Sequence, residues 1–311
     1  MSRIHEALKK AEQERAAHAS EAPTMTPITA TQVAERPSDT PDAAGEILAR
    51  TGAAAPVGNF MRFEDLQKRC AQVEWHPDPN VNVFATPSLS PHGAEQFRTL
   101  RSRLYQMRGS QQLRTLLIAS SVPAEGKTFV TNNLAQALIR QPDRRCLIID
   151  ADLRCSRLHV PLGAPPSPGL ADYLRGDADE ASVIQHGMEG NLCFIPGGKE
   201  VADPSELLLN GRLKPLLDRM APLFDWIILD SPPLLPVADA SQLADMVDGV
   251  ILVVRAGSTP TVTVERACQE LQGRNVVGVV LNAVETPHGY GYYERYGYGY
   301  GHEDSKAKAR A

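Results

Sequence analysis

Residues 114–140 read RTLLIASSVPAEGKTFVTNNLAQALIR, and this stretch indicates an α/β fold. Its first part, residues 114–121, is a short apolar run with the length of a buried strand. Residues 126–140 are predicted to form a helix, and the loop before that helix ends in Gly-Lys-Thr. A strand, such a loop and a helix in this order are typical of a phosphate-binding unit in a parallel sheet.

The same alternation continues towards the C-terminus. Further apolar strands are predicted at residues 145–150, 191–198, 225–230, 249–254 and 276–284. Helices are predicted from the Asp-Pro-Ser-Glu start at 203–206, around 238–246 and around 260–272. Continuous apolar strands bounded by helices are typical of a parallel sheet that is covered on both faces. We therefore expect a doubly wound α/β domain with a mainly parallel sheet, which binds its ligand at the carboxyl ends of the strands.

Composition limits the classes of protein to consider. A hydrophobic fraction of 42% allows a sizeable core in a chain of 311 residues, and the net charge of −5 gives no sign of nucleic-acid binding. The five scattered cysteines form no C-x-x-C pair, which favours reduced cytosolic thiols over a metal site. No apolar run approaches the ~18–20 residues that cross a bilayer, and the N-terminus lacks a signal-peptide core. These features predict a cytoplasmic protein without a nucleic-acid partner.

The chain divides into five segments by composition. Residues 1–17 are predicted to form an amphipathic helix, and residues 18–58 are an Ala/Pro/Thr-rich stretch that we expect to be a disordered linker. Residues 59–83 are expected to be a weakly ordered lead-in to the α/β domain, which we place at 84–288. Residues 289–311 are expected to be a flexible, tyrosine-rich tail.

The loop SVPAEGKT, residues 121–128, matches most of the Walker A pattern G-x-x-x-x-G-K-[ST]. Ser121 replaces the first glycine, whereas Gly126, Lys127 and Thr128 match. Gly126 lets the backbone approach phosphates, Lys127 can reach the β- and γ-phosphates, and Thr128 can offer its hydroxyl to Mg²⁺. The expected nucleotide contacts in this loop are Ala124, Glu125, Gly126, Lys127, Thr128 and Phe129. An isolated Gly-Lys-Thr also fits a simple helix cap, so the rest of the sequence decides between the two.

Two acidic motifs follow at strand ends. LIIDADLR, residues 147–154, places Asp150 at the end of one strand and Asp152 two residues later. IILDSPP, residues 227–233, ends another strand in Asp230, the Walker B position from which a carboxylate can hold the magnesium shell. Three such sites after three neighbouring strands favour nucleotide binding over helix capping. We therefore expect ATP and Mg²⁺ as cofactors and a P-loop NTPase fold of the deviant-Walker (SIMIBI-like) type.

Together these stretches resemble the bacterial tyrosine kinases of exopolysaccharide and capsule loci. The family's hallmarks are a Walker A loop without its first glycine, an Asp-x-Asp-hydrophobic-Arg motif and an Asp-Ser-Pro-Pro motif, here SVPAEGKT, DADLR and DSPP. EQFRTLR, residues 95–101, fits the family's Glu-x-x-Arg-x-x-Arg signature with Glu95, Arg98 and Arg101. The resemblance covers about residues 84–300, and the opening SRIHEALKKAE is similar to cytosolic members from exosortase-linked loci.

The resemblance implies transfer of the γ-phosphate of ATP to a tyrosine hydroxyl. Lys127 would neutralise phosphate charge, and Thr128 and Asp230 would organise the magnesium shell, which Asp150 would join. Asp152 is the family's candidate for accepting the phenol proton, although the sequence by itself allows Asp150 and Asp152 either role. A phenol with a free pKa of about 10 arrives neutral, so it must lose this proton during transfer.

The sequence leaves two interpretations open for each of two further residues, Arg154 and Asn282. Arg154 fits an ion pair with Asp150 or Asp152. Asn282, at the end of the last strand, resembles an adenine-contacting asparagine of related ATPases, and a turn-capping asparagine fits its place almost as well.

The tail GYGYYERYGYGYGHED, residues 289–304, resembles the family's terminal tyrosine cluster. Its acceptor candidates are Tyr290, Tyr292, Tyr293, Tyr296, Tyr298 and Tyr300. Residues 285–300 could span at most ~55 Å, which would reach a neighbouring subunit. A self-associating Tyr/Gly segment of low complexity is the alternative interpretation.

Glu95, Arg98 and Arg101 would share one face of a helix. The resemblance implies a homo-oligomeric ring joined through these charges and loosened by phosphorylation of the tails, whereas a solvated face with intrahelical pairs is the alternative. It also implies a separate transmembrane activator that controls polysaccharide chain length and recruits the kinase to the membrane, and a cognate tyrosine phosphatase.

Two other functions compete with a kinase. A ParA/MinD-type positioning ATPase would share the fold, but that class carries a second lysine early in the loop, where this chain has Val122. A nucleotide-gated scaffold with merely adhesive tyrosines is the third hypothesis.

Overall fold

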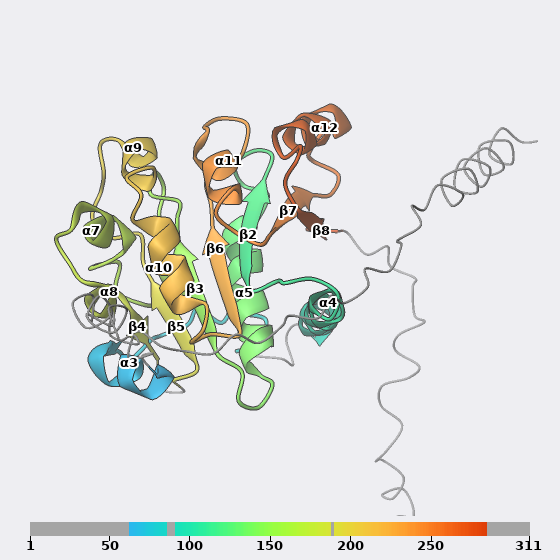
Figure 1. Cartoon of the computed structure of the whole chain (residues 1–311). Coiled ribbons are helices and arrows are strands. Elements are labelled where there is room, and N and C mark those ends of the chain that lie inside the picture. The colour runs from blue at the N-terminus through green and yellow to red at the C-terminus, as the bar shows by residue number, and fades with distance from the viewer. Residues whose placement is uncertain (1–61, 86–90, 188–189, 285–311) are drawn as a thin grey trace, which may run out of the picture. The chain divides into compact units, whose positions relative to one another are not determined.

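The computed structural model describes residues 62–85, 91–187 and 190–284 (Figure 1). The amphipathic helix, the linker and the tyrosine-rich tail expected from the sequence lie outside these residues. Among the helices that are described, none combines the length and the apolarity needed to span a bilayer.

The described part contains an eight-stranded sheet with the order β1-β4-β5-β3-β6-β2-β7-β8. Its strands are β1 (Ala71–Gln72), β2 (Thr115–Ser120), β3 (Cys146–Asp150), β4 (Gln185–His186), β5 (Leu192–Ile195), β6 (Trp226–Asp230), β7 (Gly249–Arg255) and β8 (Val276–Asn282). All neighbouring strands run parallel except β4 and β5, which are antiparallel. The doubly wound, mainly parallel sheet predicted from the sequence is thus confirmed.

Helices cover both faces of this sheet (Figure 1). They are α3 (Phe63–Arg69), α4 (Pro91–Arg108), α5 (Lys127–Ile139), α6 (His159–Leu162), α7 (Leu170–Arg175), α8 (Glu180–Val183), α9 (Pro204–Leu208), α10 (Leu213–Met220), α11 (Asp239–Ala244) and α12 (Thr261–Glu270). Buried side chains of α4, α5 and α6 form one core, and those of α3, α7, α10 and α11 belong to the other.

The strand β3 shows why the central strands read as continuous apolar runs. Cys146 and Ile148 face the core beneath α5, whereas Leu147 and Ile149 face the core beneath α10. All four side chains are buried, because successive residues of a strand point to opposite faces and both faces carry helices.

The described part of the lead-in contains the helix α3, which places Phe63 and Leu66 in the α10 core. One helix differs from the sequence-based expectation. The helix predicted from Asp-Pro-Ser-Glu is divided into α9 and α10, because Gly211 adopts a left-handed conformation with φ of 80°. A glycine of this kind ends a helix more readily than it continues one.

The sheet order places the candidate site at one edge. β3 and β6 are neighbours, and Asp150 pairs in register with Asp230. β6 is also the neighbour of β2, whose carboxyl end leads into the loop 121–126. Residues that are about eighty positions apart in the chain (Asp150 and Asp230) therefore meet beneath this loop.

Candidate active site

The loop between β2 and α5 contains two residues in the left-handed region, Ala124 at φ 65° and Gly126 at φ 97°. A Cβ atom at Gly126 would lie 2.0 Å from Nδ2 of Asn282 and would displace that side chain, and the left-handed backbone conformation itself favours glycine there. Ala124 adopts its conformation at a cost of about 1 kcal/mol that a glycine would not carry. The loop is therefore held in its shape by the surrounding structure.

The N-terminus of α5 offers a binding site for an anion. The helix runs over Lys127–Ile139, and its first backbone N–H groups have no partner within the helix. Lys127, at its first position, is only 8% exposed. The ring of Phe129 packs against Phe97, with ring centroids 5.9 Å apart, so this residue offers a ligand its backbone.

Two buried carboxylates lie beside the loop, at the ends of β3 and β6. Asp230 accepts a hydrogen bond of 2.6 Å from the hydroxyl of Thr128, which joins the sheet to the first turn of α5. Asp150 accepts hydrogen bonds from the hydroxyl of Ser156 at 2.7 Å and from the N–H of Leu158 at 2.9 Å. The structure thus brings together Thr128, Asp150 and Asp230, the predicted ligands of the magnesium shell.

The electrostatics of this pair fit a divalent cation. Burial, followed by the neighbouring Asp150 carboxylate, raises the pKa of Asp230 well above its usual value, and the hydrogen bond from Thr128 and the charge of Lys127 oppose this rise only in part. Burial also raises the pKa of Asp150. A bound Mg²⁺ would remove the repulsion, and the oxygen atoms available here are its preferred ligands. No cluster of three or more His, Cys, Asp or Glu side chains suited to a metal occurs in the part of the chain that is described.

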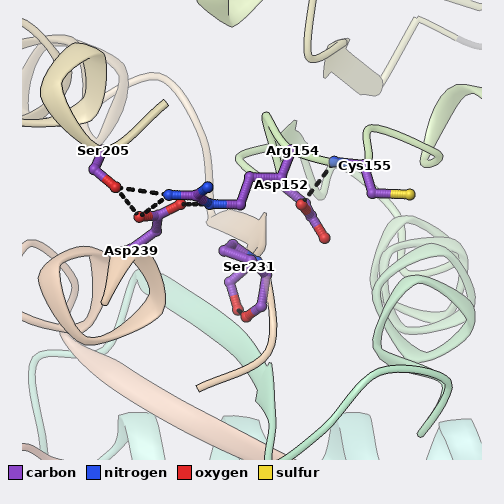
Figure 2. Close-up of polar contacts among 7 residues, drawn as sticks. Asp152, Arg154, Cys155, Ser205, Ser231 and Asp239 are labelled. Atoms are coloured by element: carbon purple, nitrogen blue, oxygen red, sulfur yellow. Dashed lines mark hydrogen bonds and ion pairs between the residues drawn. The ribbon is translucent and has the colours of Figure 1, made fainter. Parts of the chain in front are cut away.

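Asp152 lies next to this pair but is half-buried, so a substrate group can approach it. Its Oδ1 accepts a hydrogen bond of 3.0 Å from the N–H of Cys155, which fixes the orientation of the carboxylate (Figure 2). Asp150 is thus buried beside Asp230 and Asp152 is the more accessible of the two, and their separate roles stay a prediction.

Arg154 connects the Asp-x-Asp loop to two helices rather than to its own aspartates (Figure 2). Its Nε donates to Asp239 Oδ2 at 2.7 Å, and its Nη2 donates to Asp239 Oδ1 at 3.2 Å and to Ser205 Oγ at 2.8 Å. The expectation that Arg154 pairs with Asp150 or Asp152 is therefore wrong. Its side chain extends towards α11 and α9, where the buried carboxylate of Asp239 needs a cation more than the partly solvated Asp152 does.

Asn282 ends β8 close to the phosphate loop. Its Nδ2 donates to the backbone carbonyl of Glu125 at 2.9 Å, so the side chain holds the loop. Contact of Asn282 with adenine stays a prediction.

The helix α4 carries the residues expected at an oligomer interface. Arg98 forms an exposed ion pair of 3.0 Å with Glu95, as the alternative interpretation of an intrahelical pair predicts. Arg101 instead donates to the carbonyl of Ala137 in α5 at 2.8 Å. Arg101 therefore joins α4 to the helix whose N-terminus carries Lys127.

Several polar residues around the site carry no recognisable motif. Ser156 and Thr131 hydrogen-bond Asp150 and Asp230, while Ser205 and Asp239 hold Arg154. Only Ser205 had a sequence signal, because it lies in the Asp-Pro-Ser-Glu helix start. The six candidate acceptor tyrosines lie outside the described residues.

Known proteins resemble this chain in sequence and in structure, although no protein-family model matches it. Tyrosine-protein kinase etk of Escherichia coli (strain K12) is 35% identical over 211 residues, which cover 67% of this chain and 29% of the relative. This chain therefore matches less than a third of the length of that relative. Tyrosine-protein kinase YwqD of Bacillus subtilis (strain 168) is 31% identical over 216 residues, which cover 68% of this chain and 91% of the relative.

A solved structure supports the same relationship. The kinase domain of Escherichia coli tyrosine kinase ETK superimposes with a TM-score of 0.57 and 35% identity, covering 64% of this chain and 80% of that domain. Because YwqD is matched over nearly its whole length, the likeness extends to an entire relative. This chain belongs to the bacterial tyrosine-protein kinase family.

Proposed function

We propose that this chain is an ATP-dependent protein-tyrosine autokinase that phosphorylates the tyrosines of its C-terminal tail. One observation carries the proposal: the hydroxyl of Thr128, the buried carboxylates of Asp150 and Asp230, and the nearly buried Lys127 meet at the anion-binding end of α5. These groups are suited to hold a triphosphate with its Mg²⁺.

The residues divide the work of phosphoryl transfer. Lys127 and the N–H groups of the loop bind the phosphates and oppose the negative charge that develops on them. Thr128, Asp150 and Asp230 would hold Mg²⁺, which supplies charge neutralisation and orientation when bound. Burial of the two carboxylates excludes water from this part of the site.

Asp152 is placed to take the proton of the acceptor. The bond between the phenol oxygen and the γ-phosphorus forms while the bond from that phosphorus to the β,γ-bridging oxygen breaks, and ADP leaves. The phenol proton passes to the carboxylate of Asp152, whose other interaction is the N–H of Cys155. Its partial exposure would give an incoming tyrosine access.

The acceptor tyrosines would come from a neighbouring subunit. The resemblance to the family supports a ring in which Glu95, Arg98 and Arg101 contribute to the interface, and the ion pair of Glu95 with Arg98 is exposed and accessible to a partner. Each phosphate would add about −1.5 to −2 charge, so phosphorylated tails would repel and loosen the ring. We also propose that the kinase is cytoplasmic, acts with a transmembrane regulator of polysaccharide chain length, is reversed by a tyrosine phosphatase and regulates exopolysaccharide export.

The test is incubation of the purified full chain with ATP and Mg²⁺, followed by mass spectrometry for phosphotyrosine. We expect phosphate on the tail tyrosines of the wild type and none in Lys127→Ala. Mixing Lys127→Ala with an active variant whose six tail tyrosines are changed to Phe should restore phosphate to the Lys127→Ala tail, if transfer occurs between subunits. ATP hydrolysis without phosphotyrosine would instead favour a positioning ATPase, and nucleotide binding with neither product would favour a scaffold.

A further inference from the structure

The phosphate loop contains a buried carboxylate that is hydrogen-bonded to other groups of the protein. Glu125 is only 1% exposed, although it lies between Ala124 and Gly126 in a loop expected to bind an anion. Burying a carboxylate costs free energy unless hydrogen bonds compensate for the lost water. Each of its two oxygens is hydrogen-bonded, so this carboxylate has a defined structural environment.

The two oxygens join different parts of the chain. Oε2 accepts the N–H of Val122 at 2.8 Å, which closes the phosphate loop on itself. Oε1 accepts the hydroxyl of Thr259 at 2.6 Å and, more weakly at 3.4 Å, the N–H of Arg255. Both donors on this side belong to the end of β7 and the connection from β7 to α12. The side chain of Glu125 therefore ties the loop to a second segment at the same edge of the sheet.

Two further side chains hold the backbone of the loop. The guanidinium of Arg255 donates to the carbonyl of Ala124 at 3.2 Å, and Nδ2 of Asn282 donates to the carbonyl of Glu125 at 2.9 Å. In a trans peptide the carbonyl and the following N–H point in opposite directions. The N–H groups of Glu125 and Gly126 therefore point away from Arg255 and Asn282, and such N–H groups can bind a phosphate.

We propose that Glu125 is a positioning residue for the nucleotide. Its side chain, with Thr259, Arg255 and Asn282, forms a set that we call the loop clamp. The clamp holds the phosphate loop in the conformation that binds phosphate, including the left-handed residues Ala124 and Gly126. The inference rests on the proposed function in that the loop is taken to bind ATP.

The chemistry of the carboxylate makes the proposal specific. A glutamine at 125 offers one acceptor and one N–H donor in place of two acceptors. If its oxygen faces Val122, its amide faces Thr259, whose hydroxyl can turn to accept, but the N–H of Arg255 then loses its acceptor. Glu125→Gln should therefore keep part of the nucleotide affinity that the clamp provides, whereas Glu125→Ala removes all three hydrogen bonds.

The experiment measures the dissociation constant of a fluorescent ADP analogue with Mg²⁺, using the full chain at a temperature where circular dichroism shows each variant folded. We expect binding to weaken ~10- to 100-fold in Glu125→Ala and ~3- to 10-fold in Thr259→Val, since an unmade buried hydrogen bond costs about 1–3 kcal/mol. Thr259→Ser keeps the hydroxyl and should bind like the wild type. The exposed Glu265→Gln is the matched control.

A double-variant cycle and kinetics complete the test. Glu125→Ala combined with Thr259→Val should weaken binding by less than the product of the two single effects, because both substitutions remove the same hydrogen bond between Glu125 and Thr259. The KM for ATP should rise more than kcat falls, since the preformed loop binds ground state and transition state alike. A merely structural role would lower the melting temperature and leave the affinity of the folded protein unchanged.

The inference would be overturned if Glu125→Ala and Thr259→Val bind ADP within twofold of the wild type, or if Thr259→Ser is no better than Thr259→Val. If Glu125→Ala does not fold, the comparison of Thr259→Val with Thr259→Ser decides the question alone. Wild-type protein that binds ADP and forms no phosphotyrosine would overturn the kinase proposal and not this inference.

Discussion

Arg154→Gln should destabilise the domain through the carboxylate of Asp239 on α11. The guanidinium makes two hydrogen bonds to Asp239, at 2.7 and 3.2 Å, and one to Ser205 at 2.8 Å. The carboxylate side chain of Asp239 is 1% exposed, and that of Arg154 is 39% exposed. Glutamine is too short to reproduce this bidentate contact, so the substitution leaves a buried charge with the hydroxyl of Ser205 as its remaining side-chain donor.

The magnitude follows from this burial. Removing one partner of a fully buried ion pair costs about 3–5 kcal/mol. Because Arg154 is more than a third exposed, solvent screens the pair, and we expect about 2 kcal/mol. For a domain of about 200 residues, this corresponds to a fall in melting temperature of about 4–8 °C.

The dependence on pH provides a second criterion. Burial by itself would raise the pKa of Asp239, but hydrogen bonds from Arg154 and Ser205 outweigh burial and lower it. A lowered carboxyl pKa stabilises the fold above the unfolded value of about 3.9, and this stabilisation is lost as the pH falls through the folded pKa. The difference between wild type and Arg154→Gln should therefore shrink in acid.

Urea denaturation and thermal unfolding at several pH values measure both effects. Lys214→Gln is the control, because Lys214 forms an exposed i,i+4 pair with Asp218. This substitution should lower the free energy of unfolding by less than about 0.5 kcal/mol. The reasoning fails if Arg154→Gln costs no more than this control, or if its cost is the same at pH 7 and at a pH where Asp239 is protonated.

Three further predictions concern the site. The raised pKa of Asp230 means that the nucleotide-free fold loses stability as the pH rises through that pKa. Asp230→Asn should reduce this loss of stability in thermal scans. The same substitution should abolish the dependence of ADP binding on Mg²⁺. Gly126→Ala should weaken ADP binding in a fluorescence titration by ~5- to 30-fold, since the left-handed conformation costs alanine about 1–2 kcal/mol and its Cβ would displace the side chain of Asn282; wild-type affinity would contradict the geometry. Arg101→Ala should cost about 1 kcal/mol in urea denaturation and Arg98→Ala less, because only Arg101 anchors α4 to α5; equal costs would refute this assignment.

Much of the fold was accessible from the sequence because its signals are local. Apolar runs marked the strands that carry Asp150 and Asp230, and parallel strands bring their carboxyl ends to one edge. The Gly-Lys-Thr triplet marked the start of α5 correctly. The resemblance to the kinase family, which rested on these motifs, is confirmed by the relatives.

The parts that could not be predicted depend on distant contacts. Nothing in DADLR indicates that Arg154 reaches Asp239, which lies 85 residues later, because the ion pair joins the loop after β3 to a helix that is distant in the sequence. The side chain of Glu125 had no signal beyond its place in the loop, since its partner Thr259 lies in another connection.

The adjacent carboxylates of Asp150 and Asp230 have a consequence for the lifetime of the protein in a cell. Without a cation the two carboxyl groups lie buried next to each other and ionise at a cost in stability, so the empty form is the less stable one. A nucleotide that binds only the folded chain lowers the population of opened molecules by mass action. Proteases act on those opened molecules, so the abundance of the protein should follow the supply of magnesium nucleotide.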